Sequence, residues 1–304
     1  MPNIIEVNNL HKSYGKLKAV DGISFDVKRG EIFGIVGPNG AGKTTTIECI
    51  EGLRNFNRGE ISVLNLNPIK YRIDLRNRVG MQLQESSLPA RLKVWEIIDL
   101  YASFYDKSLN QKGLLEKFGL IEKKNNYFSK LSGGQKQRLF IILALLNDPD
   151  VIFLDEITTG LDPQARRAMW EIMIEIKNSG KTILLTTHFM EEAEYLCDRV
   201  AIIDNGHIIA LDTTENLIKN LNGYVQISFL VKEDFDIKIL ESLNGITNTK
   251  ITDNKVIIHG DGKNILLDVV NRLSESKIDF TNLNMKQPNL EDVFLELTGH
   301  EMRD

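Results

Sequence analysis

IFGIVGPNGAGKTTTIECI, residues 32–50, joins a short apolar segment to a glycine-rich turn and then to a helical pattern that runs to about Ile50. The turn fits G-x-x-x-x-G-K-[ST] at every specified position, between an expected strand and an expected helix. Glycines let the backbone curl so that N–H groups point at phosphate oxygens, and the helix start adds partial positive charge. A glycine-rich turn without a ligand is the plainer alternative. The pattern predicts a phosphate-binding loop made of Gly37, Pro38, Asn39, Gly40, Ala41, Gly42, Lys43, Thr44 and Thr45.

A second apolar segment, residues 151–154, ends in two carboxylates, Asp155 and Glu156. An acid at the end of a strand beside a phosphate loop can hold Mg²⁺, and a second acid can polarise the attacking water. We therefore expect Lys43 to reach the β- and γ-phosphates, Thr44 and Asp155 to hold Mg²⁺, and Glu156 to act as the catalytic base. A strand that ends in solvated acids is common, and the phosphate loop upstream is what favours the catalytic interpretation.

Strand-like and helix-like segments alternate up to about Leu211. The apolar runs at 32–36, 151–154 and 182–186 are typical of strands covered on both faces, and residues 166–177 have a helical pattern. This alternation predicts an α/β fold with a parallel core to its sheet. Two interruptions are expected: antiparallel strands at Ile4–Val7 and Ile23–Val27, and helices at Val94–Leu120 within a helical insertion at about 85–150.

A polar, asparagine-rich stretch near 220–223 indicates a linker. The patterns that follow it read strand, helix, strand, strand, helix, strand, which predicts a small α+β domain of the ferredoxin-like type, and a helix at Leu290–Leu297 ends the pattern. The sequence thus predicts two domains, residues 1–219 and 220–304.

Composition narrows the classes of function. The net charge of −5 argues against a uniformly basic binder of nucleic acid. The two cysteines, Cys49 and Cys197, lack metal-ligand spacing and are expected to be buried and reduced. No signal peptide is recognised, and the longest apolar run, Leu139–Leu146, is far below the roughly 20 residues of a membrane span. Any association with a membrane is therefore expected to come through a partner.

The segment Leu131-Ser132-Gly133-Gly134-Gln135 opens a long helical pattern that reaches Leu146. A serine and two glycines at a helix start can bind an anion. An ordinary helix cap would explain the serine but not two consecutive glycines, which weaken a helix start unless something approaches the backbone closely. At these residues, and in the order of its motifs from about Ile4 to Leu211, the chain resembles the ATP-binding subunits of ABC transporters.

The resemblance implies a P-loop NTPase domain of the ABC type, with a mixed sheet core, an antiparallel β subdomain and a helical subdomain. It implies that Tyr14 stacks on adenine, that Gln84 senses Mg²⁺ and the γ-phosphate, and that His188 contacts the γ-phosphate. Each residue alone has a plainer interpretation, and Gln82 is close enough to be the sensor instead. One departure is Ile157, which stands where the family has proline and is expected to have only a local effect.

The resemblance also implies a head-to-tail dimer around two ATP molecules with Mg²⁺. Ser132, Gly133, Gly134 and Gln135 of one subunit would then cap the γ-phosphate bound by the other, and Gly160-Leu161-Asp162 would cross the interface. Closure on ATP would push the helical insertion against a membrane-spanning permease that docks near residues 85–105. For Trp95, within that range, a place in the core is the alternative.

Residues 288–299, PNLEDVFLELTG, resemble the ending of ATPases that serve ABC-2-type exporters. The resemblance therefore implies an exporter ATPase that lies at the cytoplasmic face of a membrane and does not bind nucleic acid. Two alternatives stay open at this point: a soluble ABC-type ATPase that acts on ribosomes or nucleic acid, and a non-catalytic nucleotide-gated scaffold. A single cassette, with about ninety residues between Lys43 and Leu131, favours a transporter, and an intact Glu156 favours catalysis.

Overall fold

The computed structural model describes residues 2–82, 88–221, 225–231, 236–252, 254–260 and 264–299. The chain forms two compact units, which meet in sequence between Thr214 and Glu215. This division falls a few residues before the domain boundary that the sequence predicts at 219/220. The expected linker at 220–223 lies partly outside the described residues.

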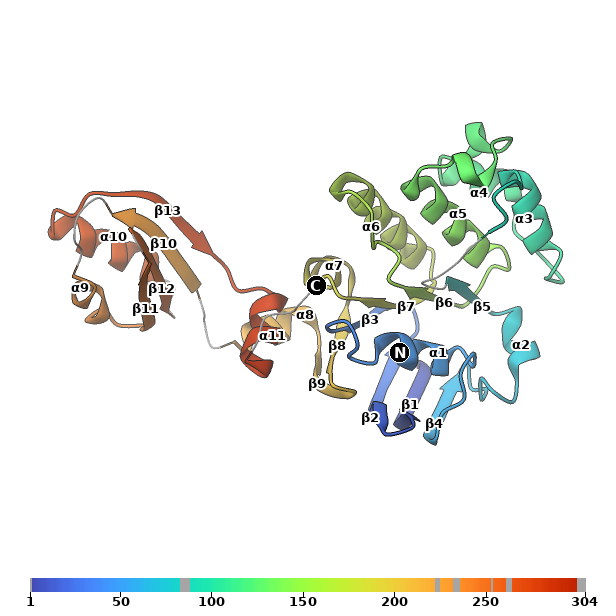
Figure 1. Cartoon of the computed structure of the whole chain (residues 1–304), viewed down its shortest axis with the longest axis horizontal. Coiled ribbons are helices and arrows are strands. Elements are labelled where there is room, and N and C mark those ends of the chain that lie inside the picture. The colour runs from blue at the N-terminus through green and yellow to red at the C-terminus, as the bar shows by residue number, and fades with distance from the viewer. Residues whose placement is uncertain are drawn as a thin grey trace. The chain divides into compact units, whose positions relative to one another are not determined.

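A six-stranded sheet in the order β5-β6-β7-β3-β8-β9 forms the centre of the larger unit. Neighbouring strands run parallel except for the last pair, which is antiparallel. In Figure 1 helix α6 lies on one side of this sheet and α1 on the other, which is why β3, β6 and β7 are buried along their whole length. The expected α/β fold with a parallel core is confirmed. The bounds are β3 Ile32–Val36, β5 Val79–Gln82, β6 Val151–Asp155, β7 Thr182–Thr187, β8 Arg199–Asp204, β9 His207–Asp212, α1 Lys43–Ile50, α6 Pro163–Asn178 and α7 Met190–Leu196.

An antiparallel sheet in the order β2-β1-β4 covers the α1 side, and it contains both strands expected near the N-terminus. Phe25 of β2 stacks on Phe33 of β3, with ring centroids 5.1 Å apart, and the apolar side chains around them form one core that joins the two sheets. The phosphate loop leaves β3 inside this core. The bounds are β1 Asn3–Tyr14, β2 Leu17–Lys28 and β4 Arg58–Val63.

The helical insertion is confirmed, and it is attached to the sheet through β5. Gly80 of β5 lies so close to α5 that a Cβ there would stand 1.9 Å from the carbonyl oxygen of Ala144. The apolar run that the sequence shows at 139–146 covers the second half of α5 and its C-cap, and all of its residues except the partly buried Phe140 are buried. Among the described residues, no helix combines the length and the apolar character needed to cross a membrane. The bounds are α2 Arg72–Arg76, α3 Val94–Ala102, α4 Gln111–Lys117, two short 3₁₀ turns at Ile121–Lys123 and Phe128–Lys130, and α5 Gly133–Leu145.

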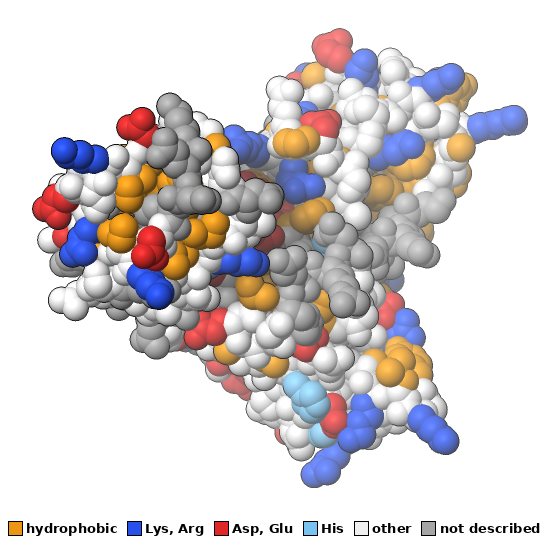
Figure 2. Space-filling model, turned by 60° about the vertical axis from the view of Figure 1, so that its left-hand side comes forward, with side chains coloured by type: hydrophobic (Ala, Val, Ile, Leu, Met, Phe, Trp, Pro, Cys, Tyr) orange, Lys and Arg blue, Asp and Glu red, His pale blue; other side chains and the backbone are white. Residues whose placement is uncertain are grey.

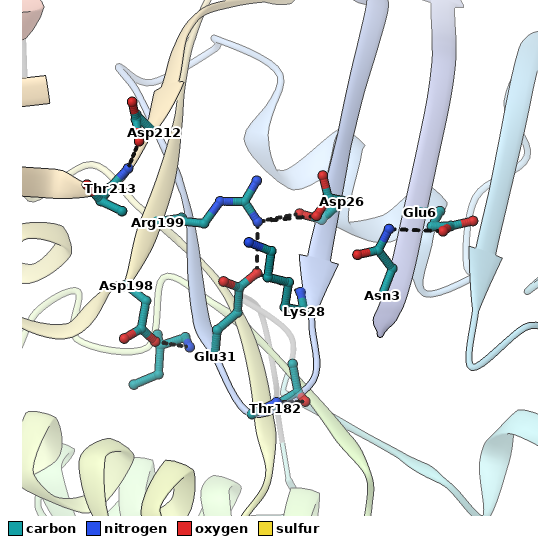
Figure 3. A network of polar contacts seen from close by, with 12 residues as sticks. Asn3, Glu6, Asp26, Lys28, Glu31, Thr182, Asp198, Arg199, Asp212 and Thr213 are labelled. Atoms are coloured by element: carbon teal, nitrogen blue, oxygen red, sulfur yellow. Dashed lines mark hydrogen bonds and ion pairs between the residues drawn. The ribbon is translucent and has the colours of Figure 1, made fainter. Parts of the chain in front are cut away.

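Polar contacts tie the amino ends of the parallel strands together (Figure 3). The Arg199 guanidinium lies 3.2 Å from Glu31 Oε1 and 3.3 Å from Asp26 Oδ2. The backbone N–H of Ile32 donates to Asp198 Oδ2, and that of Gly30 donates to the Thr182 hydroxyl. This network fixes the start of β3 against β7 and β8, and so it sets the register at which β3 delivers the phosphate loop at its other end.

The smaller unit has a four-stranded sheet in the order β11-β12-β10-β13, with every neighbouring pair antiparallel. Apolar residues of β10 and β12 pack with those of α10 in a separate core. This confirms the expected ferredoxin-like βαββαβ order. The side of this unit that faces the viewer in Figure 2 also exposes hydrophobic side chains. The bounds are α8 Thr214–Lys219, β10 Val225–Val231, α9 Lys238–Glu241, β11 Ile246–Thr252, β12 Lys255–Gly260, α10 Ile265–Glu275, β13 Phe280–Lys286 and α11 Leu290–Thr298.

Candidate functional site

The loop between β3 and α1 is held by close backbone contacts that only glycine permits. Gly42 has φ +106°, and a Cβ there would stand 2.2 Å from the carbonyl oxygen of Ala19. A Cβ on Gly37 would stand 2.1 Å from the carbonyl oxygen of Ile203. The N–H of Gly206 donates to the carbonyl of Ala41 at 3.0 Å. These contacts fix the loop between β2 and β8.

Lys43 is the cation of this loop, and its side chain is buried. Its Nζ donates to the carbonyl oxygens of Gly37 at 3.0 Å and Pro38 at 3.2 Å, and it lies 3.3 Å from Glu156 Oε1. Burial lowers the pKa of Lys43, while the carboxylates of Glu156 and Asp155 act in the opposite direction. The ammonium group thus lies inside the curl of the loop, where a phosphate would need it.

Asp155 at the end of β6 receives two hydroxyl groups. Thr186, its neighbour in register on β7, donates to Asp155 Oδ1, and the Thr44 hydroxyl lies 3.4 Å from the same oxygen. Burial raises the pKa of Asp155, and both hydroxyl hydrogen bonds oppose that rise. Thr186 was missed by the sequence analysis, although the pairing of two strand ends at one edge of the sheet is a signal that points to it. A carboxylate and a hydroxyl are hard oxygen donors of the kind that Mg²⁺ prefers, so Thr44 and Asp155 fit this ion.

Glu156 and His188 face each other beside Lys43. Glu156 Oε2 lies 3.4 Å from His188 Nδ1, and the other carboxylate oxygen faces Lys43. Glu156 has φ +49°, a conformation that costs a non-glycine residue of the order of 1 kcal/mol. Its N–H is held by both the carbonyl and the hydroxyl oxygen of Thr186, each at 3.2 Å. The strained backbone turns the carboxylate away from the strand and towards the loop.

The segment after Glu156 leads through two tight turns to α6. Asp162 caps α6 by accepting from the N–H of Ala165 at 2.9 Å, and Pro163 begins the helix. Ile157, in place of the family's proline, is buried. Its carbonyl accepts a hydrogen bond from the Gln137 side chain of α5. Gln137 was also missed, because the contact joins residues that are distant in sequence.

The ring of His188 has a support that the sequence did not reveal. The centroids of the His188 and Phe189 rings are 4.1 Å apart, and the Arg166 guanidinium lies 3.9 Å from the centre of the Phe189 ring. In the same region Trp170 Nε1 donates to the buried carboxyl group of Glu192 at 2.9 Å. Residues of α6 therefore contact the segment that carries His188, and α6 begins directly after Asp162.

The helix start at Ser132 is capped within this chain. The Ser132 hydroxyl accepts from the N–H of Gln135 at 3.3 Å, and the Gln135 side chain accepts from the N–H of Ser132 at 3.0 Å. A Cβ on Gly133 or Gly134 would meet only ordinary contacts, at 3.8 Å and 3.5 Å. The packing of the described chain thus does not require glycine at either position, and no described hydrogen bond joins this helix start to Lys43.

Tyr14 and Gln84 are the remaining predicted site residues. Tyr14 is 41% exposed, with Lys12 Nζ 4.9 Å and the Arg54 guanidinium 5.5 Å from the centre of its ring. Gln84 lies outside the described residues. Gln82, the alternative for its role, is buried at the end of β5.

Comparisons with known proteins agree with this arrangement. A family model for the ABC transporter family matches residues 20–159. The linearmycin resistance ATP-binding protein LnrL of Bacillus subtilis is 34% identical, over 99% of this chain and 100% of that protein. The Nod factor export ATP-binding protein I of Ralstonia nicotianae is 38% identical, over 99% of this chain and 95% of that protein.

The likeness extends to solved structures. A dimeric ATP-binding cassette in a post-hydrolysis state, bound to ADP and Pi, matches with a TM-score of 0.62 and 25% identity, over 69% of this chain and 98% of that chain. The full-length match at 34% identity, together with the phosphate loop and the acids beside it, identifies the family. This chain belongs to the ABC transporter ATP-binding subunits and is an ATPase of that family.

Proposed function

We propose that the chain drives export through a membrane-spanning permease, by closing on ATP-Mg²⁺ as a head-to-tail dimer and hydrolysing it. The proposal rests on one observation: the predicted site residues form two groups that no described hydrogen bond joins. Glu156 lies within contact distance of both Lys43 and His188, whereas the helix start at Ser132 has no described hydrogen bond to these residues. A second copy, or a homologous subunit, supplies that helix start from outside.

Binding of the triphosphate follows from the loop. Phosphate oxygens accept from the backbone N–H groups of residues 39–45, and the Lys43 ammonium exchanges loop carbonyls for the β- and γ-phosphates. Thr44, Asp155 and Gln84 would hold Mg²⁺, which would neutralise part of the negative charge of the phosphates. Tyr14, which is 41% exposed, stacks on the adenine ring.

Hydrolysis falls to Glu156 and His188. The Glu156 carboxylate, held by its strained backbone and by Lys43, accepts a proton from the attacking water. His188 lies against Glu156 Oε2 and donates towards the γ-phosphate. General base catalysis of this kind contributes about 10²- to 10⁴-fold to the rate.

The two glycines at the start of α5 support the dimer. The packing of the described chain does not require glycine at these two positions. Glycine there lets another molecule approach the backbone closely, and that molecule is the γ-phosphate bound by the second cassette. The helix N-terminus and the N–H groups of Ser132, Gly133, Gly134 and Gln135 then face the phosphate, and Asp162 crosses the interface. The dimeric cassette bound to ADP and Pi is a precedent for two copies on the product.

Export and the membrane partner rest on the relatives. LnrL is named for linearmycin resistance, and protein I for Nod factor export. The chain would lie at the cytoplasmic face, with the permease near residues 85–105, where Trp95 is 44% exposed while Val94 beside it is buried. Of the alternatives, action on ribosomes or nucleic acid has no observation in its favour, and the net charge of −5 argues against it.

The test separates dimer closure from hydrolysis. The Glu156→Gln variant is expected to form a stable dimer on ATP-Mg²⁺ in size-exclusion chromatography, and Gly134→Trp added to it is expected to abolish that dimer. A Cβ on Gly134 meets only a 3.5 Å contact in its own chain, and circular dichroism checks that the variant folds. A Gly134→Trp chain that still dimerises on ATP contradicts the proposed interface.

A further inference from the structure

Glu192 is a buried acid to which the mechanism proposed above gives no role. It lies in the first turn of α7 and is 2% exposed, whereas Glu191 beside it is exposed. An acid in the first turn of a helix commonly stabilises the helix dipole from the surface, and Glu191 already occupies such a position. Burial of a carboxyl group is costly unless the group is hydrogen-bonded, so the place of Glu192 needs another explanation.

The carboxyl group of Glu192 is surrounded by polar groups from neighbouring elements. Trp170 Nε1 of α6 donates to Glu192 Oε1 at 2.9 Å, and Trp170 is itself buried. Burial raises the pKa of Glu192. Four groups oppose that rise: the hydroxyl groups of Thr187 and Thr158, the indole of Trp170 and the positive charge of Arg166. One carboxyl group thus interacts with side chains from three separate segments of the chain.

Thr187 places one of these interactions directly beside His188. It is the residue before His188, it is buried, and its hydroxyl accepts from the N–H of Phe189 at 3.0 Å. A single hydroxyl group therefore joins the residues on both sides of the histidine. Because the same hydroxyl also acts on Glu192, the carboxyl group is linked to the turn that aims the imidazole.

Thr158 places a second interaction beside the catalytic acid. It follows Glu156 by two residues and is 1% exposed. Glu192 therefore lies against the two segments whose side chains meet where Glu156 Oε2 approaches His188 Nδ1 at 3.4 Å. These segments continue from different strands, β6 and β7, and a buried polar group between them can fix their separation.

We infer that Glu192 is a positioning residue for hydrolysis, whose buried carboxyl group holds the segments that carry Glu156 and His188 at the separation at which the two side chains meet. The inference rests on the roles proposed above for Glu156 and His188, and it adds the group that sets their geometry. A displacement of a reacting group by about 1 Å can cost a factor of about 10² in rate, so a residue that acts only through neighbouring segments can affect kcat.

A surface contact between the same two helices provides a matched control. The Tyr195 hydroxyl of α7 donates to Glu171 Oε1 of α6 at 2.7 Å, and Tyr195 is 52% exposed. The Tyr195 ring also stacks on Trp170, with centroids 5.0 Å apart. Tyr195→Phe keeps this stacking and removes only the exposed polar contact between α6 and α7. It therefore separates a general need for that contact from the specific need for Glu192.

Steady-state ATPase measurements on the full chain test the inference, with rates expressed per chain that binds ATP so that an unfolded fraction does not count. Glu192→Leu removes both acceptor oxygens and is expected to lower kcat about tenfold while KM for ATP stays within about twofold of wild type. Glu192→Gln keeps an acceptor for the Trp170 indole and is expected to stay within about threefold of the wild-type kcat. Tyr195→Phe is expected to leave kcat and KM unchanged.

A second variant tests the route to the histidine. Thr187→Val keeps the shape of the side chain and removes the hydroxyl group that lies between Glu192 and the turn at His188. It is expected to lower kcat about as much as Glu192→Leu, and the two substitutions combined are expected to cause almost no further loss. If Glu192→Leu binds no ATP, Thr187→Val decides alone, and a wild-type kcat in that variant overturns the inference.

The remaining outcomes separate this inference from the proposed function. A Glu156→Gln chain that hydrolyses ATP at the wild-type rate overturns both. A slow Glu156→Gln chain together with a Glu192→Leu chain of wild-type kcat overturns this inference alone. A rise in KM that accounts for the loss of activity, an equal loss in Tyr195→Phe, or losses that multiply when Thr187→Val and Glu192→Leu are combined also overturn it, because Glu192 would then support the fold and not the geometry of the site.

Discussion

The central sheet of the larger unit buries charged groups at both ends of its strands, and the two ends use them differently. At the amino ends, Arg199 Nη1 donates to the carbonyl and carboxylate oxygens of Asp26 and to Glu31 Oε1 (Figure 3). At the carboxyl ends, Lys43 bonds to loop carbonyls and to Glu156, which has a strained backbone. The first set holds strands in register, whereas the second holds groups that a ligand can rearrange.

The largest effect is expected at the carboxyl end. Glu156→Gln removes the base but keeps the shape, so the ATPase rate is expected to fall by about 10²- to 10⁴-fold. Nucleotide affinity is expected to stay close to wild type, because the loop's N–H groups, which bind the phosphates, are unchanged. Phosphate release and filter binding measure the two quantities. If wild type and Glu156→Gln hydrolyse ATP at equal rates, Glu156 is not the catalytic base.

At the amino end, the expected loss is in stability and not in turnover. Arg199→Met leaves the buried acid of Glu31 without its cation, which is expected to cost about 3 kcal/mol in the free energy of unfolding. Arg29→Met is the matched control, because the Arg29–Asp150 pair is exposed and is expected to contribute about 0–1 kcal/mol. Urea unfolding of the nucleotide-free chain measures both. Similar losses in the two variants would mean that the network contributes no more than a surface pair.

Sequence patterns predicted those site residues that lie next to a recognisable segment of the chain. The loop at 37–44, the acids after β6 and His188 after β7 each follow a short apolar segment, and the structure brings them together. Thr186, Gln137 and the Arg166–Phe189 stack were not found, because each depends on a contact between distant segments.

A smaller effect on turnover is expected from the support of His188. Phe189→Leu removes the ring that contacts both Arg166 and His188, and kcat is expected to fall about tenfold because the imidazole loses its fixed orientation. In a His188→Ala background the same substitution is expected to have almost no further effect on kcat, since the ring it positions is gone. Phe104→Leu, at an exposed aromatic, is the control. Independent, multiplying losses would show that Phe189 acts on the fold and not through His188.

The smallest effect concerns the stability cost of burying Asp155, the carboxyl group proposed to hold Mg²⁺. Burial raises the pKa of Asp155, so above its ordinary value of 3.8 the native chain binds more protons than the unfolded chain. Stability is therefore lost as the pH rises from about 3.8 through the raised pKa. Without nucleotide, Asp155→Asn is expected to be more stable than wild type at about pH 8, with a difference that shrinks as the pH falls towards about 4. With ATP-Mg²⁺ the order is expected to reverse, because saturating ligand stabilises only the chain that binds it, by about 2.7 kcal/mol at 100 times Kd. Thermal unfolding at both pH values, with and without ATP-Mg²⁺, tests the sign. An asparagine variant that is less stable under every condition would place Asp155 with the register-holding charges of the amino end.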